Sequence, residues 1–69
     1  MIDYAYITRL QGLRDKMWAD SDAAMERGHY ATAHRCMAQA SGVSAAITAL
    51  TTYDMDVLTV QRMEEALGE

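Results

Sequence analysis

The absence of charge in the middle of the chain constrains its fold more than any other feature. Residues 36–53 contain no Asp, Glu, Lys or Arg, although charged residues make up 23% of the 69 residues. Such a stretch must be covered on nearly all sides, by a membrane or by other protein segments. Its many serines and threonines, with Gln39, argue against a membrane span. We therefore expect a helix packed among several neighbours in a soluble bundle, with small residues allowing close approach.

The length of the chain limits how many neighbours that helix can have. Residues 1–69 form one domain, and a single core of this size supplies only about 3 to 5 kcal/mol of stability. One cysteine, Cys36, cannot form an intramolecular disulfide. Oligomerisation is the remaining source of neighbours, so we expect a homodimer or small homo-oligomer.

Apolar residues recur at helical spacing along almost the whole chain, which predicts an all-α fold. The expected helices span about 3–27, 29–51 and 54–67. Gly28 favours a tight turn after the first helix, and a threonine-rich segment weakens helix propensity before the third. The predicted architecture is an antiparallel helical hairpin plus a shorter third helix, completed as a bundle by oligomerisation. One long helix over 29–67 is the alternative.

The side of each helix that carries apolar residues predicts which residues form the core. In the second helix these residues alternate three and four apart, as in a heptad repeat. The expected core residues are Ile2, Tyr6, Leu10, Leu13, Met17, Ala24, Tyr30, Ala33, Cys36, Met37, Ala40, Val43, Ile47, Leu50, Val57, Val60, Met63 and Leu67.

Two further sets of residues are candidates for contacts with other molecules. A large apolar side chain away from the core stripe of a soluble protein implies a partner. The candidate partner-binding residues are Trp18, Met25, Met55 and Leu58. Alanines seven residues apart on the second helix, with an apolar residue of the first, are candidates for self-association: Ala31, Ala38, Ala45 and Ile7.

The balance of charge argues against several classes of partner. Six basic residues against ten acidic ones give a net charge of −4, and the basic residues are scattered. Nucleic-acid binders gather basic residues on one face, so DNA or RNA is an unfavoured partner, with a dimeric DNA-binding regulator kept as an alternative. The first residues do not have the pattern of a signal peptide, so we expect a cytoplasmic protein.

Catalytic and metal-binding chemistry is poorly represented in the sequence. No nucleophile elbow, phosphate-binding loop or Cys-x-x-Cys pair is present, so we expect no enzyme and no cofactor. Glu26 and His29 have the Glu-x-x-His spacing of di-metal helical bundles, which leaves a metal-binding bundle as an alternative. Because Gly28 lies inside this motif, we expect the two residues to separate and hold no metal.

Residues 28–40 resemble part of a known repeat. Gly28, Tyr30, Ala33, Met37 and Ala40 are similar to the second half of a tetratricopeptide repeat. The resemblance implies a helical hairpin in which the tyrosine packs across the turn and the alanines let the helices close together. It does not extend to the first half of the repeat, and a single copy implies no peptide-binding groove.

Together these observations predict a small non-enzymatic interaction or regulatory protein. It would self-associate through helix packing and engage another protein through its exposed apolar residues. The scarcity of lysine, the lack of Phe and Asn and the abundance of alanine are common in GC-rich bacteria and their phages. A phage-encoded accessory protein that acts on a host protein is therefore one expectation.

Overall fold

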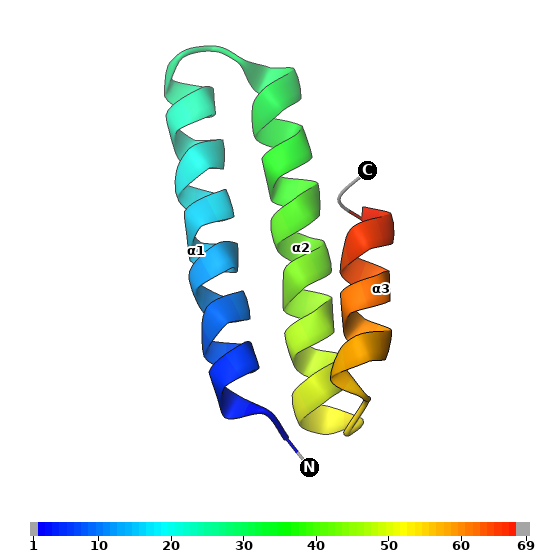
Figure 1. The fold of residues 1–69 in the computed structure, drawn as a ribbon. Helices are drawn as coiled ribbons and strands as arrows, with labels where there is room; N and C mark the ends of the chain where they lie inside the picture. Colours follow the sequence, from blue (N-terminus) through cyan, green and yellow to red (C-terminus); the bar gives the residue numbers. More distant parts are fainter. Residues whose placement is uncertain (1, 68–69) are drawn as a thin grey trace.

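The chain folds into three α-helices, which confirms the all-α prediction. The computed structural model describes residues 2–67 and contains α1 (Tyr4–Glu26), α2 (Tyr30–Thr52) and α3 (Val57–Leu67). α2 lies between the other two helices, antiparallel to both, as Figure 1 shows. The molecule is elongated, with extents of 42 × 20 × 15 Å. The uncharged stretch thus occupies the central helix of the fold.

Both ends of α1 are determined by local hydrogen bonds. The side chain of Asp3 accepts a hydrogen bond from the backbone N–H of Tyr6, as an N-cap residue does. At the other end, Gly28 N–H donates to Met25 O and His29 N–H donates to Ala24 O, which together form a Schellman motif. The motif requires a left-handed residue, and Gly28 supplies it with a φ of 77°. The turn between the helices therefore lies where the glycine predicts it.

The connection between α2 and α3 begins one residue later and ends three residues later than the sequence predicts, since α2 ends at Thr52 and α3 begins at Val57. Asp54 has a φ of 52°, which turns the chain out of the helix. Asp56 then caps α3, because its Oδ1 accepts a hydrogen bond of 2.7 Å from Leu58 N–H. α3 consequently begins at Val57 and not at residue 54.

The core divides into two zones along the long axis. Near the chain's N-terminal end, residues of all three helices meet in one cluster around Val60, which is fully buried. The cluster comprises Tyr6, Ile7, Leu10, Val43, Ala46, Leu50 and Val60. Toward the Gly28 turn only α1 and α2 remain, and the buried residues there are small: Ser21, Ala24, Ala33 and Ala40. Small side chains let these two helices lie close together.

Several residues lie elsewhere than their periodicity predicts. Tyr30 is 66% exposed, so it does not pack across the turn. Leu13, Met63 and Leu67 are also exposed, although their spacing predicts core positions. The alanines of the second helix fulfil the expectation of close packing, since Ala33 and Ala40 are buried.

Candidate interaction site

Three of the four predicted partner-binding residues lie on the surface. Trp18 and Met25 are exposed on α1, and Leu58 is exposed on α3. Met55 is partly buried and packs against the core cluster, so it presents less of its side chain than the other three. Leu58 and the two α1 residues come from helices that flank α2 on different sides, and the fold does not gather them into one site (Figure 1).

The predicted self-association residues also divide into two groups. Ala31, Ala38 and Ala45 are exposed along α2, which leaves that face open. Ile7 is only 5% exposed and belongs to the core cluster, so its side chain packs inside the chain and does not lie on the surface with the alanines.

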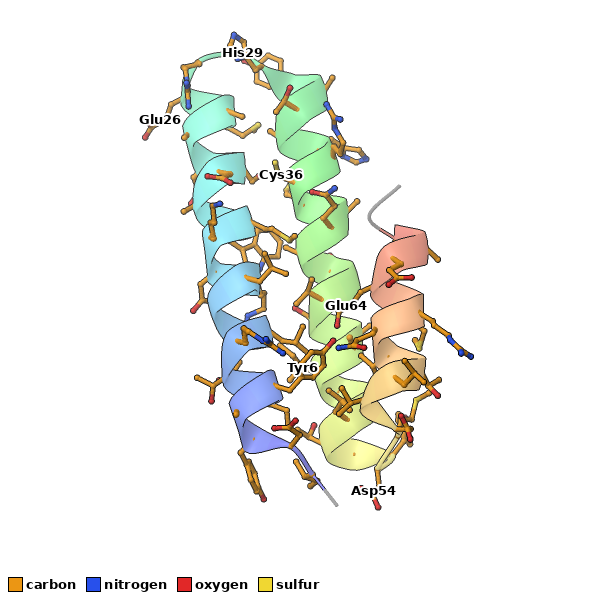
Figure 2. The ribbon with its side chains drawn as sticks, in the orientation of Figure 1. Tyr6, Glu26, His29, Cys36, Asp54 and Glu64 are labelled. Atoms are coloured by element: carbon orange, nitrogen blue, oxygen red, sulfur yellow. The ribbon has the colours of Figure 1, made fainter. Side chains whose placement is uncertain are left out.

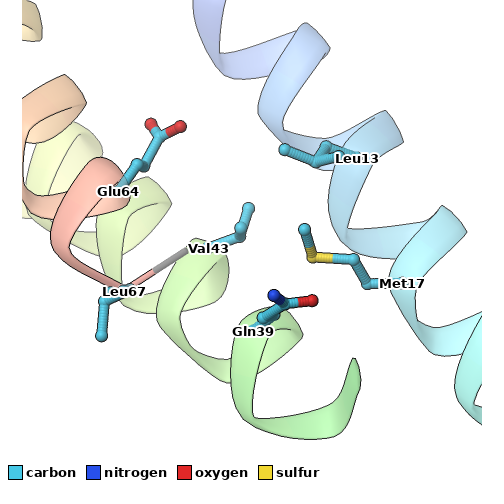
Figure 3. Close-up of a pocket in the computed structure, with 6 residues that line it drawn as sticks. All are labelled: Leu13, Met17, Gln39, Val43, Glu64 and Leu67. Atoms are coloured by element: carbon cyan, nitrogen blue, oxygen red, sulfur yellow. The ribbon is translucent and has the colours of Figure 1, made fainter. Parts of the chain in front are cut away.

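The most distinctive surface feature is a cleft between α1 and α3. It has a volume of about 210 Å³, and α2 forms its floor. Figure 3 shows Leu13 and Met17 extending from α1 toward Val43 of α2. The lining residues are Leu13, Met17, Gln39, Val43, Glu64 and Leu67, and most of the lining is apolar. The cleft therefore offers an apolar surface with a carboxylate on one side.

A hydrogen bond between α1 and α3 lies beside the cleft. The Tyr6 hydroxyl donates to Oε1 of Glu64 over 2.6 Å, and Figure 2 shows the two side chains pointing toward each other. Burial of the phenol, together with the hydrogen bond to the Glu64 carboxylate and its charge, raises the pKa of Tyr6 to about 12. The Arg9 guanidinium, 5.1 Å from the centre of the Tyr6 ring, partly opposes this rise. The phenol thus stays neutral at physiological pH.

Close contact between Gly42 and Leu67 fixes the far end of α3. A Cβ atom at Gly42 would lie 2.7 Å from Cδ1 of Leu67, closer than ordinary van der Waals contact. The glycine therefore lets α3 approach the backbone of α2. Since Leu67 also lines the cleft, this contact determines the cleft's width at that end.

The two residues of the Glu-x-x-His motif lie at the turn between α1 and α2. Glu26 ends α1 and His29 precedes α2, and Figure 2 shows the two side chains pointing away from each other. Within residues 2–67, no three His, Cys, Asp or Glu side chains gather closely enough to hold a metal ion. In the same range, no helix combines the length and apolarity needed to cross a bilayer.

Sequence reasoning did not find the cleft because its lining residues follow the predicted core stripes. Leu13, Met17 and Leu67 are all predicted core residues, yet Leu13 and Leu67 are exposed and Met17 is only partly buried. The short length of the third helix was the feature from which an open cleft could have been predicted. An 11-residue helix cannot cover a 23-residue one, so part of the apolar side of the hairpin had to remain open.

Comparison of the chain with protein family models, curated proteins and solved structures finds no significant match.

Proposed function

We propose that this protein is a small non-enzymatic interaction protein that binds a helix of another protein in the cleft between α1 and α3. The observation that carries the proposal is the cleft itself, where Leu13, Met17, Val43 and Leu67 present apolar surface from three helices. An amphipathic helix can lay its apolar side into such a groove. In this role α2 forms the floor of the binding site as well as the centre of the fold.

The open shape of the cleft suits a side chain of a partner helix, whereas a small-molecule site usually encloses most of its ligand. The cleft of about 210 Å³ adjoins a more open hollow of about 540 Å³, with which it shares Leu13 and Glu64. One large apolar side chain on a partner helix would fill the smaller of these two spaces. A partner of this kind needs no catalytic residue, which agrees with the lack of a catalytic motif in the sequence.

The charges beside the cleft favour a basic residue on the partner. Glu64 lines the cleft. Glu64 and Glu65 also line the more open hollow that adjoins the cleft beside Tyr6 and Arg9. A Lys or Arg next to the partner's apolar anchor would face these carboxylates. The preferred ligand is therefore an amphipathic helix with a large apolar anchor and a neighbouring positive charge. A host protein bound by a phage-encoded accessory protein is one such partner.

Self-association is the second part of the proposal. The chain has an accessible surface of 4811 Å², whereas a compact monomer of 7.7 kDa has about 4,300 Å². The exposed face of α2 that carries Ala31, Ala38 and Ala45 is available for helix packing. Light scattering at micromolar concentrations is expected to give a dimer or small oligomer, and a stable monomer would refute this part.

The binding proposal is tested by two leucines that differ in position. Leu13 is 38% exposed and lines the cleft, whereas Leu58 is 55% exposed and lies outside it. In a pull-down from the native host, Leu13→Arg is expected to lose a protein that the wild type and Leu58→Arg both retain. Circular dichroism checks that each variant keeps its helicity.

Two other outcomes would contradict the cleft as the binding site. If Leu13→Arg captures the partner normally and Trp18→Ala loses it, binding takes place on the exposed side of α1 instead. If no variant differs from the wild type in what it captures, no apolar contact in the cleft contributes to binding.

A further inference from the structure

The connection between α2 and α3 is bent, although its sequence is compatible with a continuous helix. Residues 43–67 contain neither glycine nor proline. The bend includes Asp54, whose φ of 52° lies in the left-handed region, which costs free energy for most residues and less for aspartate than for most others. If residues 53–56 all took helical angles, α2 and α3 would become one helix. This is the alternative that the sequence alone left open.

The contacts that hold α3 do not require α3 and its docking surface to belong to the same chain. Val60 inserts into the core cluster, Glu64 accepts the Tyr6 hydrogen bond, and Leu67 lies against Gly42. At 11 residues, α3 is shorter than the roughly 12 to 15 residues that an isolated helix needs in water. It must therefore dock to stay helical. A second copy of this chain offers the same docking surface.

We propose that two copies of the protein exchange α3, with α2 and α3 of each copy joined in one continuous helix. In the closed form α3 runs antiparallel to α2 (Figure 1). If a twofold axis passes through residues 53–56 of two straightened chains, their long helices lie side by side and antiparallel. Each α3 then lies antiparallel to the α2 of the other copy, as it does to its own α2 in the closed form. This exchange is a form of domain swapping, which short strained connections favour. It deepens the self-association part of the proposed function and is independent of the cleft's partner.

Opposing effects keep the closed and exchanged forms in balance. The exchanged form releases the left-handed Asp54 and adds backbone hydrogen bonds across residues 53–56. The closed form keeps the cap that Asp56 gives to α3 and avoids the entropy cost of association. The exchanged dimer should accordingly increase with protein concentration.

A disulfide between α2 and α3 reports which chain each α3 binds. Cβ of Leu67 lies 3.5 Å from the position that a Cβ would take at Gly42, within the usual range for a disulfide. The test variant combines Gly42→Cys and Leu67→Cys with Cys36→Ser, which removes the native thiol. It is concentrated, equilibrated, oxidised and separated by non-reducing electrophoresis. The expected result is a covalent dimer whose share rises with concentration.

Two results of the disulfide experiment would overturn the exchange. If every disulfide is intrachain while light scattering shows a dimer, the copies associate through another surface and the proposed self-association survives. If the disulfides are intrachain and the protein is a monomer throughout, both the exchange and the self-association are wrong.

A matched pair of substitutions at Asp54 gives a second, independent measurement. Asp54→Gly and Asp54→Ala remove the same carboxylate, so any contact of that side chain is lost in both. Glycine accepts the left-handed conformation and weakens a helix, whereas alanine disfavours the bend and favours the helix. For each chain, we expect the equilibrium between the bent and the straight connection to favour the straight form about thirtyfold more in Asp54→Ala than in Asp54→Gly, equivalent to about 2 kcal/mol. Because a dimer contains two such connections, its dissociation constant should be about a thousandfold lower for Asp54→Ala. Equal dissociation constants for the two variants, measured by analytical ultracentrifugation, would overturn the proposal.

Discussion

The hydroxyl of Tyr6 and the carboxylate of Glu64 join α1 to α3 over 2.6 Å, although the two residues are 58 positions apart in the sequence. The phenol is buried, and its ring carries Arg9 on one face. This bond connects the two helices that flank α2 and therefore ties the first and last helices of the chain together. It also lies beside the proposed binding cleft.

Removing the phenol oxygen is expected to weaken the docking of α3. Tyr6→Phe keeps the ring but deletes the donor, and a hydrogen bond to a charged acceptor contributes about 1.5 to 3 kcal/mol. Because Glu64 remains partly accessible to water, we expect a loss near the lower end, about 1.5 kcal/mol, in urea denaturation. Glu64→Gln keeps an acceptor oxygen and should cost less. An equal or larger cost for Glu64→Gln would contradict this account.

The raised pKa of Tyr6 predicts a loss of stability in alkaline solution. The pKa is about 12 in the folded chain against an ordinary value of 10, so the folded state retains the proton longer. Between pH 10 and 12 the unfolded chain binds fewer protons than the folded one, and the free energy of unfolding decreases as the pH rises. The free energy of unfolding falls by about 2 to 3 kcal/mol in all over this range. Below pH 10 the stabilising contribution of the Tyr6 phenol is fully present.

Other groups also titrate in this range, so the measurement is a difference between two proteins. The wild type should lose stability between pH 10 and 12 more steeply than Tyr6→Phe, which has no phenol at this position. Parallel curves for the two proteins would show that the phenol has the same pKa in the folded and unfolded chains.

The glycines at positions 12 and 42 should respond differently to alanine. A Cβ at Gly12 meets nothing within 4 Å, so Gly12→Ala should raise the free energy of unfolding by about 1 kcal/mol through helix propensity. At Gly42 the same gain is opposed by the contact with Leu67, whose side chain must move aside. We expect Gly42→Ala to be nearly neutral. Thermal melts of the two variants make the comparison, and an equal gain at both positions would mean that α3 does not press on Gly42.

Ser21 joins α1 to the backbone of α2. Its hydroxyl is buried and donates to Ala33 O over 3.2 Å. Ser21→Ala should cost about 1 kcal/mol for the lost hydrogen bond, and Ser21→Leu should cost more, about 1 to 3 kcal/mol, because it forces the helices apart. Ser41→Leu, on the exposed side of α2, is the control and should change the denaturation midpoint little. A tolerated leucine at position 21 would mean that the hairpin can open there without penalty.

The parts of the fold that follow from local chemistry could be predicted from the sequence. Helical periodicity gave three helices, and Gly28 predicted the turn because only a residue that accepts positive φ completes that motif. The start of α3 was missed by three residues because two aspartates compete for the cap. Asp54 is the nearer to α2, but Asp56 makes the hydrogen bond.

The candidate site depends on how far one helix covers another, which periodicity does not express. Leu13 and Leu67 have the spacing of core residues and still border an open cleft, because α3 ends beside Gly42. Ile7 shows the reverse error, since it lay off the predicted stripe and is buried. For Leu13 and Leu67 the hydrophobic pattern gives the direction of the side chain but not the extent of the neighbouring helix, whereas for Ile7 the pattern gives the wrong direction.

The two zones of the core give the molecule a gradient of local stability along its length. Around Val60 three helices share large apolar side chains, whereas near the Gly28 turn two helices meet through alanines and Ser21. Less apolar area is buried per residue at the turn, so opening there requires less free energy than opening at the other end. Backbone amides close to the turn will exchange with deuterium first, and those of the three-helix cluster last. The turn is therefore where the hairpin begins to separate, whereas α1 and α2 stay together longest beside the three-helix cluster.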